Sequence, residues 1–406
     1  MKILHINVRL FEGGAAQVAR DLQNRQILAG NESRFLYGYG SGAKPSKGQS
    51  LVSGVAVLGS RWRVGMNFVL HSILGVDLLP PGPREARLLR ESLLWADVIH
   101  LHAIHSYFLP FEWFVQELIR SHKPVVWTLH DFWPITGRCA SLEDCDGWLT
   151  GCGSCQGRRN YPSSHFDLSR SMFIKKHAGI FRLLPQLHFI APSKFVYDLV
   201  KVAYPEVKID LISNSVDLVF ERAVESLDKK IKITDQKCNN SVKILVVAND
   251  LSDKTKVDRG LIEKIIALPN VRLTTVGSNS PFHSKNIENK GVIVSRLEYA
   301  AVLAAADALL FTSRKDTFGL VMAEALFCGT PVLAVNSPAA IEVLGMIGSR
   351  PCNDEYEFVS SCKSPYELGP FAGISREKLQ KTAVKKYEGK RMVNEYVAVY
   401  DKSINP

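Results

Sequence analysis

Two acidic residues stand eight positions apart in the stretch SRKDTFGLVMAEALFCGTPVLA, residues 313–334: Asp316 comes first and Glu324 second. The apolar spacing predicts a helix over 319–328, with Asp316 in the loop before it and Glu324 about one and a half turns inside. The free N–H groups and dipole at a helix start bind anions, and carboxylates accept hydrogen bonds from hydroxyl groups. A ligand with phosphate between two hydroxyl-bearing ends, such as a sugar nucleotide, would suit this arrangement.

A purely structural interpretation of these two acids is also open. Asp316 would then cap the helix, and Glu324 would pair with a lysine or arginine, because charged side chains are usually solvated or paired. Gly319, between the two acids, allows a tight backbone turn or a close approach of a ligand to the backbone.

Four further residues could take part in chemistry near strand ends. Gly13 and Gly14 follow the first predicted strand, His130 follows the strand 124–130, and Lys256 follows the strand 242–250. Each also has an ordinary interpretation: a turn at the start of a helix for the glycines, a hydrogen-bonded core side chain for the histidine, and a surface side chain for the lysine.

The loop 131–162 contains four cysteines with the spacing C-x5-C-x6-C-x2-C: Cys139, Cys145, Cys152 and Cys155. A Cys-x2-Cys pair with two more thiols nearby fits a tetrahedral structural zinc site. Free thiols are the equal alternative, and disulfides are disfavoured in a reducing compartment. The histidines of this half, His100, His102 and His105, are interpreted as structural residues at a strand end, because no carboxylate partner is evident nearby.

Strands and helices alternate along the chain, which predicts βαβ units and parallel sheets. The alternation stops in the charged segment 221–242, which we expect to be a linker, and then restarts. We therefore expect an α/β protein with two Rossmann-like, doubly wound domains that face each other across a cleft. The predicted domains are 1–215, 216–385 as the ligand-binding domain, and a final helix in 386–406 that crosses back to the first. A short strand is expected at 291–295.

The 406 residues have a formal net charge of +10. This charge favours anionic partners, but no zinc-finger histidine pair or run of basic residues suggests nucleic acid. No apolar run is long enough to cross a bilayer, and the N-terminus does not resemble a signal peptide, so we expect a cytoplasmic protein.

The stretch 61–79 is apolar with basic flanks. It would form either a core helix of the first domain or an interfacial helix on the inner face of the plasma membrane. The basic cluster 170–177 would add attraction to an anionic membrane surface.

These motifs together resemble retaining glycosyltransferase family 4, which has the GT-B fold. Asp316 and Glu324 occupy the two acidic positions of its E-x7-E signature, and EGGAA (12–16) resembles its first glycine-rich loop. WTLHD resembles the segment with the active-site histidine, here His130, and VVANDLSDKTK the segment with the phosphate-binding lysine, here Lys256. DVIHLH and ISNSVD (212–217) match two more family segments, and the cysteine loop resembles transferases of colanic-acid-type exopolysaccharide synthesis.

The resemblance implies transfer of a hexosyl or deoxyhexosyl group from a nucleoside-diphosphate sugar, with retention and without a catalytic metal, to a lipid-linked saccharide. It assigns the diphosphate to Lys256 and to the backbone near Phe318, Gly319 and Leu320, while Gly13 and Gly14 approach the phosphates or the acceptor. It assigns the ribose to Glu324, hydroxyls of the donor sugar to Asp316, and a contact near the reacting carbon to His130.

The sequence departs from the family pattern at three places. Asp316 is one methylene shorter than the usual glutamate, Ser215 replaces a glycine, and Asn249 and Asp250 stand where Gly-Arg usually precedes the lysine. The candidates for the missing cation are Lys254, Arg259 and Arg314. A sugar-nucleotide epimerase or hydrolase, or a non-catalytic sugar-nucleotide-binding subunit, is therefore the alternative function. A nicotinamide dehydrogenase is disfavoured because no G-x-G-x-x-G follows either first strand.

Overall fold

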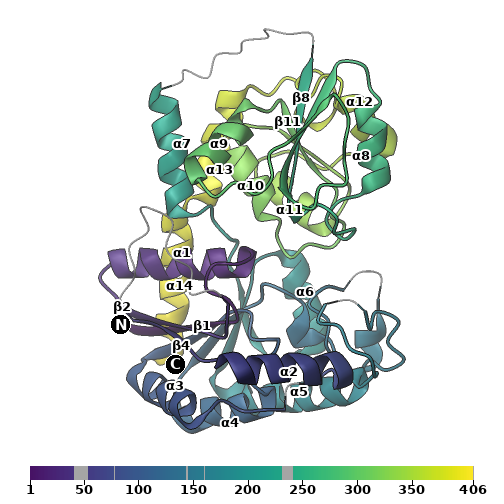
Figure 1. The fold of residues 1–406 in the computed structure, drawn as a ribbon. Coiled ribbons are helices and arrows are strands. Elements are labelled where there is room, and N and C mark those ends of the chain that lie inside the picture. The colour runs from purple at the N-terminus through teal and green to yellow at the C-terminus, as the bar shows by residue number, and fades with distance from the viewer. Residues whose placement is uncertain (41–53, 77, 143–144, 160, 231–240, 406) are drawn as a thin grey trace. The chain divides into compact units, whose positions relative to one another are not determined.

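The computed structural model contains two compact units, each built on its own parallel sheet (Figure 1). One unit comprises Met1–Ser213 and Met392–Pro406, and the other comprises Asn214–Arg391. The structure describes residues 1–40, 54–76, 78–142, 145–159, 161–230 and 241–405.

The first unit has a seven-stranded parallel sheet in the order β3-β2-β1-β4-β5-β6-β7. The strand order reverses between β1 and β4, and such a switch point is where open α/β sheets bind ligands, beyond the carboxyl ends of the strands. The strands are β1 (Lys2–Asn7), β2 (Glu32–Tyr37), β3 (Val55–Val57), β4 (Val98–Leu101), β5 (Val125–Thr128), β6 (Leu187–Ala191) and β7 (Lys208–Leu211).

Helices cover both faces of this sheet (Figure 1). One face is apolar: Leu4, Ile6, Leu101 and Trp127 share a core with residues of α3 to α6. The other face lies under α1 and α14 and includes the buried His5 and His100. The helices are α1 (Gly14–Leu28), α2 (Arg61–Leu74), α3 (Pro83–Trp95), α4 (Phe111–Ser121), α5 (Ser169–Leu183), α6 (Lys194–Ala203) and α14 (Gly389–Ile404).

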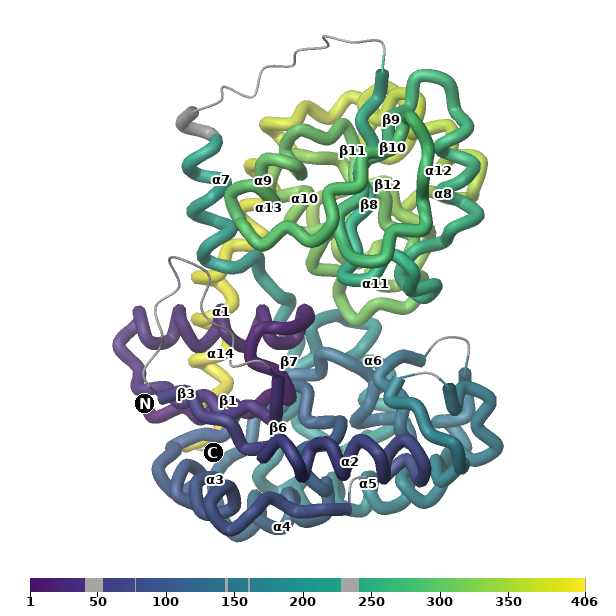
Figure 2. Tube along the Cα trace, in the orientation of Figure 1, coloured from purple at the N-terminus to yellow at the C-terminus, as the bar shows by residue number. Residues whose placement is uncertain are grey.

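The second unit has a five-stranded parallel sheet in the order β10-β9-β8-β11-β12, which the tube in Figure 2 traces through its core. Its strands are β8 (Val242–Asp250), β9 (Val271–Ser278), β10 (Ile287–Asn289), β11 (Ala308–Phe311) and β12 (Val332–Ala334). Its helices are α7 (Leu218–Lys230), α8 (Arg259–Ile266), α9 (Arg296–Ala305), α10 (Leu320–Phe327), α11 (Pro338–Gly345), α12 (Glu355–Ser361) and α13 (Arg376–Tyr387).

Two predictions about the second unit are wrong. The charged segment after 221 begins as helix rather than linker, because α7 buries Phe220, Ala223 and Val224 in the core; residues 231–240 lie outside the described part. The strand predicted at 291–295 is found at β10 instead, where Ile287 pairs with Leu273 of β9. Val292 and Val294, within the predicted strand 291–295, are exposed, so the apolar pattern there does not reflect burial.

Within the apolar stretch 61–79, the helix α2 (Arg61–Leu74) lies on the surface and is not a core helix. In α2 the buried residues are the polar Asn67 and His71, while Trp62, Phe68 and Val69 are exposed. Among the helices of the described residues, none is both long and apolar enough to span a bilayer.

Candidate active site

Gly319 precedes the first residue of α10, and the backbone conformation at this position requires a glycine. Its φ of +82° is left-handed, and a Cβ at this position would lie 2.5 Å from Met322 Cε and 3.2 Å from Phe311 Cζ. The helix then continues because Met322, Ala323 and Leu326 are buried in the core. Gly319 is itself the cap residue and no side chain caps the helix, so Asp316 does not have the capping role.

Asp316 forms an ion pair with Lys256: Lys256 Nζ lies 2.8 Å from Asp316 Oδ2. Lys256 follows β8 and Asp316 follows β11, and these two strands are neighbours in the sheet. The two loops are also tied through Thr312, whose hydroxyl donates to the Lys256 carbonyl at 3.0 Å and accepts from the Asp258 N–H at 3.0 Å. The sheet therefore brings an exposed cation and a partly buried acid together beside the start of α10.

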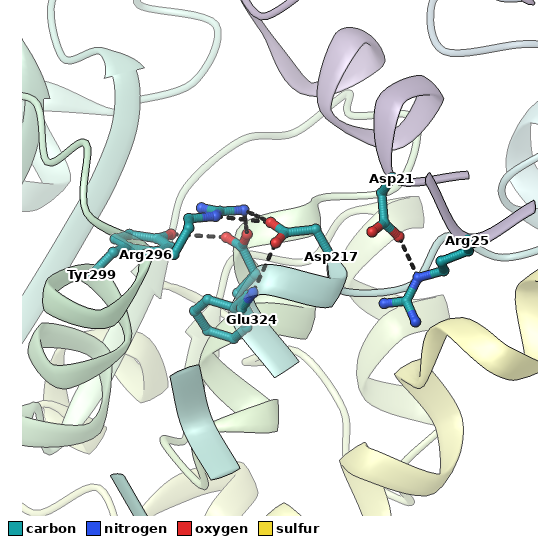
Figure 3. A network of polar contacts seen from close by, with 7 residues as sticks. Asp21, Arg25, Asp217, Arg296, Tyr299 and Glu324 are labelled. Carbon is teal, nitrogen blue, oxygen red and sulfur yellow. Dashed lines mark hydrogen bonds and ion pairs between the residues drawn. The ribbon is translucent and has the colours of Figure 1, made fainter. Parts of the chain in front are cut away.

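Glu324 belongs to a buried polar network in the same unit (Figure 3). Its Oε1 accepts from Arg296 Nη2 at 3.0 Å, and its Oε2 accepts from the Tyr299 hydroxyl at 2.9 Å. Arg296 also donates from Nε to Asp217 Oδ2 at 2.8 Å, and Asp217 Oδ1 accepts from the Phe220 N–H at the start of α7.

Charge compensation explains the titration of this network. Burial alone would lower the pKa of Arg296, but Glu324 and Asp217 raise it above its usual value. Burial, followed by the charge of Glu324, raises the pKa of Tyr299 well above its usual range. Glu324 is thus paired with an arginine, which is the arrangement that the structural interpretation of the sequence predicts.

The sequence did not single out Arg296 or Asp217. Of the three cations considered for the missing arginine, Arg259 pairs with Glu263 on its own helix at 2.8 Å, while Lys254 and Arg314 are exposed. Arg296 lies at the start of α9. Nothing in the sequence of this helix indicates that Arg296 pairs with Glu324, 28 positions away, or with Asp217, 79 positions away.

In the first unit, Gly13 and Gly14 are exposed at the start of α1. Gly13 is the cap residue with a φ of +88°, and the first turn of α1 contains no acidic residue. Arg9 lies close by, 3.0 Å from Glu12 and stacked on the ring of Tyr39 at 3.9 Å. This helix start therefore offers N–H groups and a nearby guanidinium, a combination that suits an anion.

His130 lies just beyond β5 and is part of a row of hydrogen-bonded imidazoles. Its Nε2 lies 2.9 Å from His102 Nδ1, and His102 Nε2 lies 3.0 Å from His5 Nδ1. Desolvation by the surrounding protein lowers the pKa of His130 and of His5 to about 4, so both rings are neutral at pH 7.

Asp131, next to His130, pairs with His105, for which the sequence predicts a structural role. His105 Nε2 lies 3.1 Å from Asp131 Oδ2, and His105 Nδ1 lies 2.6 Å from the hydroxyl of Ser106. The Tyr161 hydroxyl donates to the same Ser106 oxygen at 2.9 Å. Ser106 and Tyr107 both have a φ of +73°, a strained backbone of the kind that clusters at functional sites.

The four cysteines of the loop 131–162 line one cavity of about 610 Å³. Among the described residues, the group whose ligand atoms all lie within 4.8 Å of one another is His5, His100 and His102, and the four thiols do not form such a group. Burial raises the pKa of Cys139 to about 12 and also raises those of Cys152 and Cys155. The arrangement resembles free thiols, and the expected zinc site has no support from these distances.

Comparison with known proteins assigns the chain to a family. The model of Glycosyltransferase Family 4 matches residues 12–220, slightly more than half of the sequence. The chain belongs to glycosyltransferase family 4. The model of Glycosyl transferases group 1 matches residues 242–362 of this family 4 glycosyltransferase, within the second unit.

A similar protein of Escherichia coli K12 aligns over nearly the whole length. It is WcaC, whose name assigns it to colanic acid biosynthesis as a glycosyl transferase; it is 35% identical over 98% of this chain and 99% of its own. An N-acetyl-alpha-D-glucosaminyl L-malate synthase of Bacillus anthracis is 27% identical over 36% of this chain and 40% of its own.

Solved structures confirm the expected GT-B fold. Anabaena HepE, solved in complex with UDP-glucose, has a TM-score of 0.63 at 14% identity over 99% of this chain and 100% of its own. The pneumococcal O-GlcNAc transferase GtfA, solved with UDP and GlcNAc, has a TM-score of 0.62 at 11% identity over 100% of this chain and 99% of its own. At these identities the likeness concerns the fold alone.

Proposed function

We propose that this glycosyltransferase moves a hexosyl or deoxyhexosyl group from a nucleoside-diphosphate sugar to a lipid-linked saccharide, with retention of configuration, in exopolysaccharide assembly of the colanic-acid type. The near full-length similarity to WcaC supports the pathway, and the UDP complexes of the structural relatives support the donor class. The observation that carries the proposal is the Lys256–Asp316 pair beside the start of α10.

The donor diphosphate is assigned to Lys256 and to the N–H groups around Phe318, Gly319 and Leu320. The first N–H groups of a helix have no intrahelical acceptor, so they can bind phosphate oxygens in the dipole field of α10. Charge that develops on the leaving diphosphate is then stabilised by fixed protein groups, a contribution of several kcal/mol in comparable sites. In this proposal the protein cations, and no metal ion, supply that stabilisation.

The hydroxyl-bearing ends of the donor are assigned to the two acids. Asp316 accepts from hydroxyls of the transferred sugar, after Lys256 has exchanged part of its contact with Asp316 for the diphosphate. Glu324 accepts from the ribose hydroxyls. Because each carboxylate oxygen has two lone pairs, this contact is compatible with the bonds that Glu324 already accepts from Arg296 and Tyr299.

The acceptor side is assigned to the first unit. Gly13 and Gly14 bring the backbone at the start of α1 against the donor phosphates or the acceptor, and His130 contacts the transferred sugar near its reacting carbon. A lipid-linked acceptor requires contact with a membrane, which we assign to the exposed apolar face of α2 and its basic residues Arg61 and Arg63.

Donor-dependent release of nucleoside diphosphate tests the reaction. We expect one of the UDP-, GDP- or ADP-sugars to stabilise the protein thermally, because a ligand that binds only the folded state raises the melting temperature. With a saccharide acceptor, the product should have the anomeric configuration of the donor by NMR. An inverted linkage would contradict the retaining mechanism.

The same assay separates the two alternatives. An epimerase or hydrolase would convert the donor fully without any acceptor, whereas a transferase needs the acceptor for rapid turnover. A non-catalytic subunit would bind one sugar nucleotide tightly and release no diphosphate with any acceptor tried. Either result would replace the proposed transfer.

A further inference from the structure

A buried polar cluster lies on the α1 and α14 side of the first sheet, and the proposed reaction uses only one of its members, His130. It combines side chains from three strands, the ends of two of these strands and two helices. Its members within hydrogen-bond distance of one another are Gln26, His5, His102, His130, His100, Tyr400, Thr128 and Tyr396.

Three of the imidazoles form an in-line hydrogen-bonded row. The ring planes of His130 and His102 differ by 19°, and those of His102 and His5 by 17°, with N···N distances of 2.9 and 3.0 Å. A nitrogen lone pair lies in the plane of its ring, so nearly coplanar rings at this distance fit N–H···N hydrogen bonds.

A metal centre would need His5, His100 and His102 to converge on one point. Instead His100 stacks against His102, with ring centroids 4.1 Å apart and planes tilted by 30°. Both nitrogens of His100 have other partners, the Thr128 hydroxyl at 2.8 Å and the Tyr400 hydroxyl at 2.6 Å. The geometry therefore favours a chain of hydrogen bonds over a metal site.

The direction of this chain follows from Gln26. Its Oε1, 2.8 Å from His5 Nε2, can only accept, so His5 bears its proton on Nε2. His5 Nδ1 then accepts from His102 Nε2–H, and His102 Nδ1 accepts from His130 Nε2–H. With neutral rings, this leaves the lone pair of His130 on Nδ1.

The amide nitrogen of Gln26 determines the direction of the hydrogen bonds in the other half of the cluster, through Tyr400, His100 and Thr128. It donates to the Tyr400 hydroxyl at 3.0 Å, so Tyr400 donates to His100 Nδ1 and His100 donates from Nε2 to Thr128. If the oxygen and nitrogen of the Gln26 amide exchanged places, the direction of the hydrogen bonds would reverse in both halves of the cluster. The proton of His130 would then be on Nδ1. A single side chain of α1, held by α14, thus decides the tautomer of a histidine at the end of β5.

We propose that Gln26 is a positioning residue for the transfer reaction: through His5 and His102 it holds His130 as the Nε2–H tautomer, which presents an Nδ1 lone pair to a hydroxyl of the bound sugar. The catalytic part of this inference rests on the proposed function, whereas the tautomer itself does not. Neighbouring hydrogen bonds polarise one another, which favours one direction for the whole chain over a mixture.

Long-range ¹H–¹⁵N spectra of the full-length protein with ¹⁵N-labelled histidine test the tautomer at pH 7, because protonated and unprotonated ring nitrogens resonate in separate ranges. We expect His130 and His102 to be protonated at Nε2 only. A His130 protonated at Nδ1, or an imidazolium at this pH, would overturn the inference without any variant. So would stoichiometric zinc that binds the purified protein and displaces these protons.

Two variants at Gln26 test its role. Gln26→Met keeps the volume but removes both polar atoms, and we expect mixed tautomers at His130 and a kcat about tenfold lower, with the donor KM unchanged. Gln26→Glu keeps an acceptor facing His5 and should restore the Nε2–H tautomer and most of kcat. Mixed tautomers with full kcat would refute the positioning role.

The two proposals fail in different ways. A protein that transfers no sugar but shows the expected tautomers would disprove the proposed function alone, while an active enzyme with the opposite tautomer would disprove this inference alone. Thermal unfolding of each variant identifies a loss of fold. If Gln26→Met does not fold, Tyr400→Phe removes the acceptor of the amide with little change of shape and should give the same mixed tautomers; unchanged tautomers would count against the chain.

Discussion

Lys256 Nζ and Asp316 Oδ2 lie 2.8 Å apart, which joins the loop after β8 to the loop after β11 in the second unit. The lysine is 43% exposed and the acid 19%, so this pair adds little to stability, about 1 kcal/mol or less. Removing one member of this pair should therefore cost little stability, so a variant can test the proposed contact with the donor separately from folding.

Lys256→Ala should therefore reduce transfer much more than stability. We expect kcat/KM to fall at least about a hundredfold, because a charge-assisted contact to the leaving diphosphate is worth roughly 3 kcal/mol or more, while the melting temperature stays within a few degrees. Lys285→Ala, at another exposed lysine of the unit, is the matched control. Equal activity of the two variants would remove Lys256 from the site.

The Asp217–Arg296–Glu324 network should behave in the opposite way (Figure 3). Arg296→Met leaves two largely buried carboxylates without their cation, and breaking a buried pair from one side costs about 3–5 kcal/mol. Unfolding in urea, followed through the transition of the second unit, measures this loss in the free energy of unfolding. If Arg296→Met unfolds at the wild-type midpoint, the network is not a structural element.

Sequence patterns were sufficient to predict the two parallel sheets, and the family resemblance assigned Asp316 and Lys256 to the same donor, although it did not predict their ion pair. Both residues follow strands of one parallel sheet, and the carboxyl ends of such strands meet at the same edge. They were not sufficient to find Arg296, because an ion pair between α9 and α10 depends on how two helices pack and leaves no mark on the periodicity of either.

The histidine row shows the same limit. Strand alternation places His100 and His102 on one side of the chain, but His5 of the row comes from another strand, where it is opposite His100 in the register of β1 and β4. Register depends on the packing of the whole sheet and cannot be read from either strand alone. The exposed valines at 292 and 294 show the converse case, in which a β-type pattern corresponds to no strand.

Lys176 should make stability depend on alkaline pH. Its ammonium group is buried, donates to the Gly137 carbonyl at 3.1 Å and lies 3.7 Å from the centre of the Trp133 ring. Burial lowers its pKa from 10.5 to about 7. Between these values the unfolded chain binds more protons than the folded one, so the free energy of unfolding from this group rises with pH from about 7 to 10.5.

Lys176→Met should remove that dependence. We expect the variant to be more stable than the wild type at pH 6, by at most about 5 kcal/mol, with the difference shrinking towards pH 10.5. Urea midpoints measured at several pH values give this difference directly, and titrations shared by both proteins cancel. A difference that stays constant with pH would show that Lys176 titrates normally.

The basic cluster 170–177 also offers a membrane one cation fewer than its sequence suggests, since Lys176 is buried.

Acid should destabilise the protein through the histidine row before the carboxylates titrate. His5 and His130 have pKa values lowered to about 4 by desolvation, against 6.5 when unfolded. The unfolded chain therefore binds more protons in this window, and each group removes up to about 1.4 kcal/mol per pH unit as the pH falls from 6.5 towards 4. Urea midpoints at pH 7, 6 and 5 should decline steadily; constant midpoints would contradict neutral, buried imidazoles.

The apolar face of α2 should bind anionic vesicles. Trp62 and Phe68 are 60% and 53% exposed, and burying one such side chain is worth about 1.5 kcal/mol or more. We expect Trp62→Ser with Phe68→Ser to reduce cosedimentation with phosphatidylglycerol vesicles at least tenfold. Leu94→Ser, at a 67% exposed position of α3, is the control. Equal sedimentation of both proteins would exclude α2 as the membrane contact.

The chain passes between the units at Ser213 and again at Arg391, so the first unit is assembled from two separate pieces of sequence. Tyr396 and Tyr400, which close its histidine face, are translated only after all of the second unit. A ribosome-bound chain halted before Met392 would expose that face to solvent, so the amino-terminal half cannot finish packing until residues 392–404 have been synthesised. For the same reason, expressing residues 1–213 alone should yield an incompletely packed product, which coexpressed 389–406 peptide could repair.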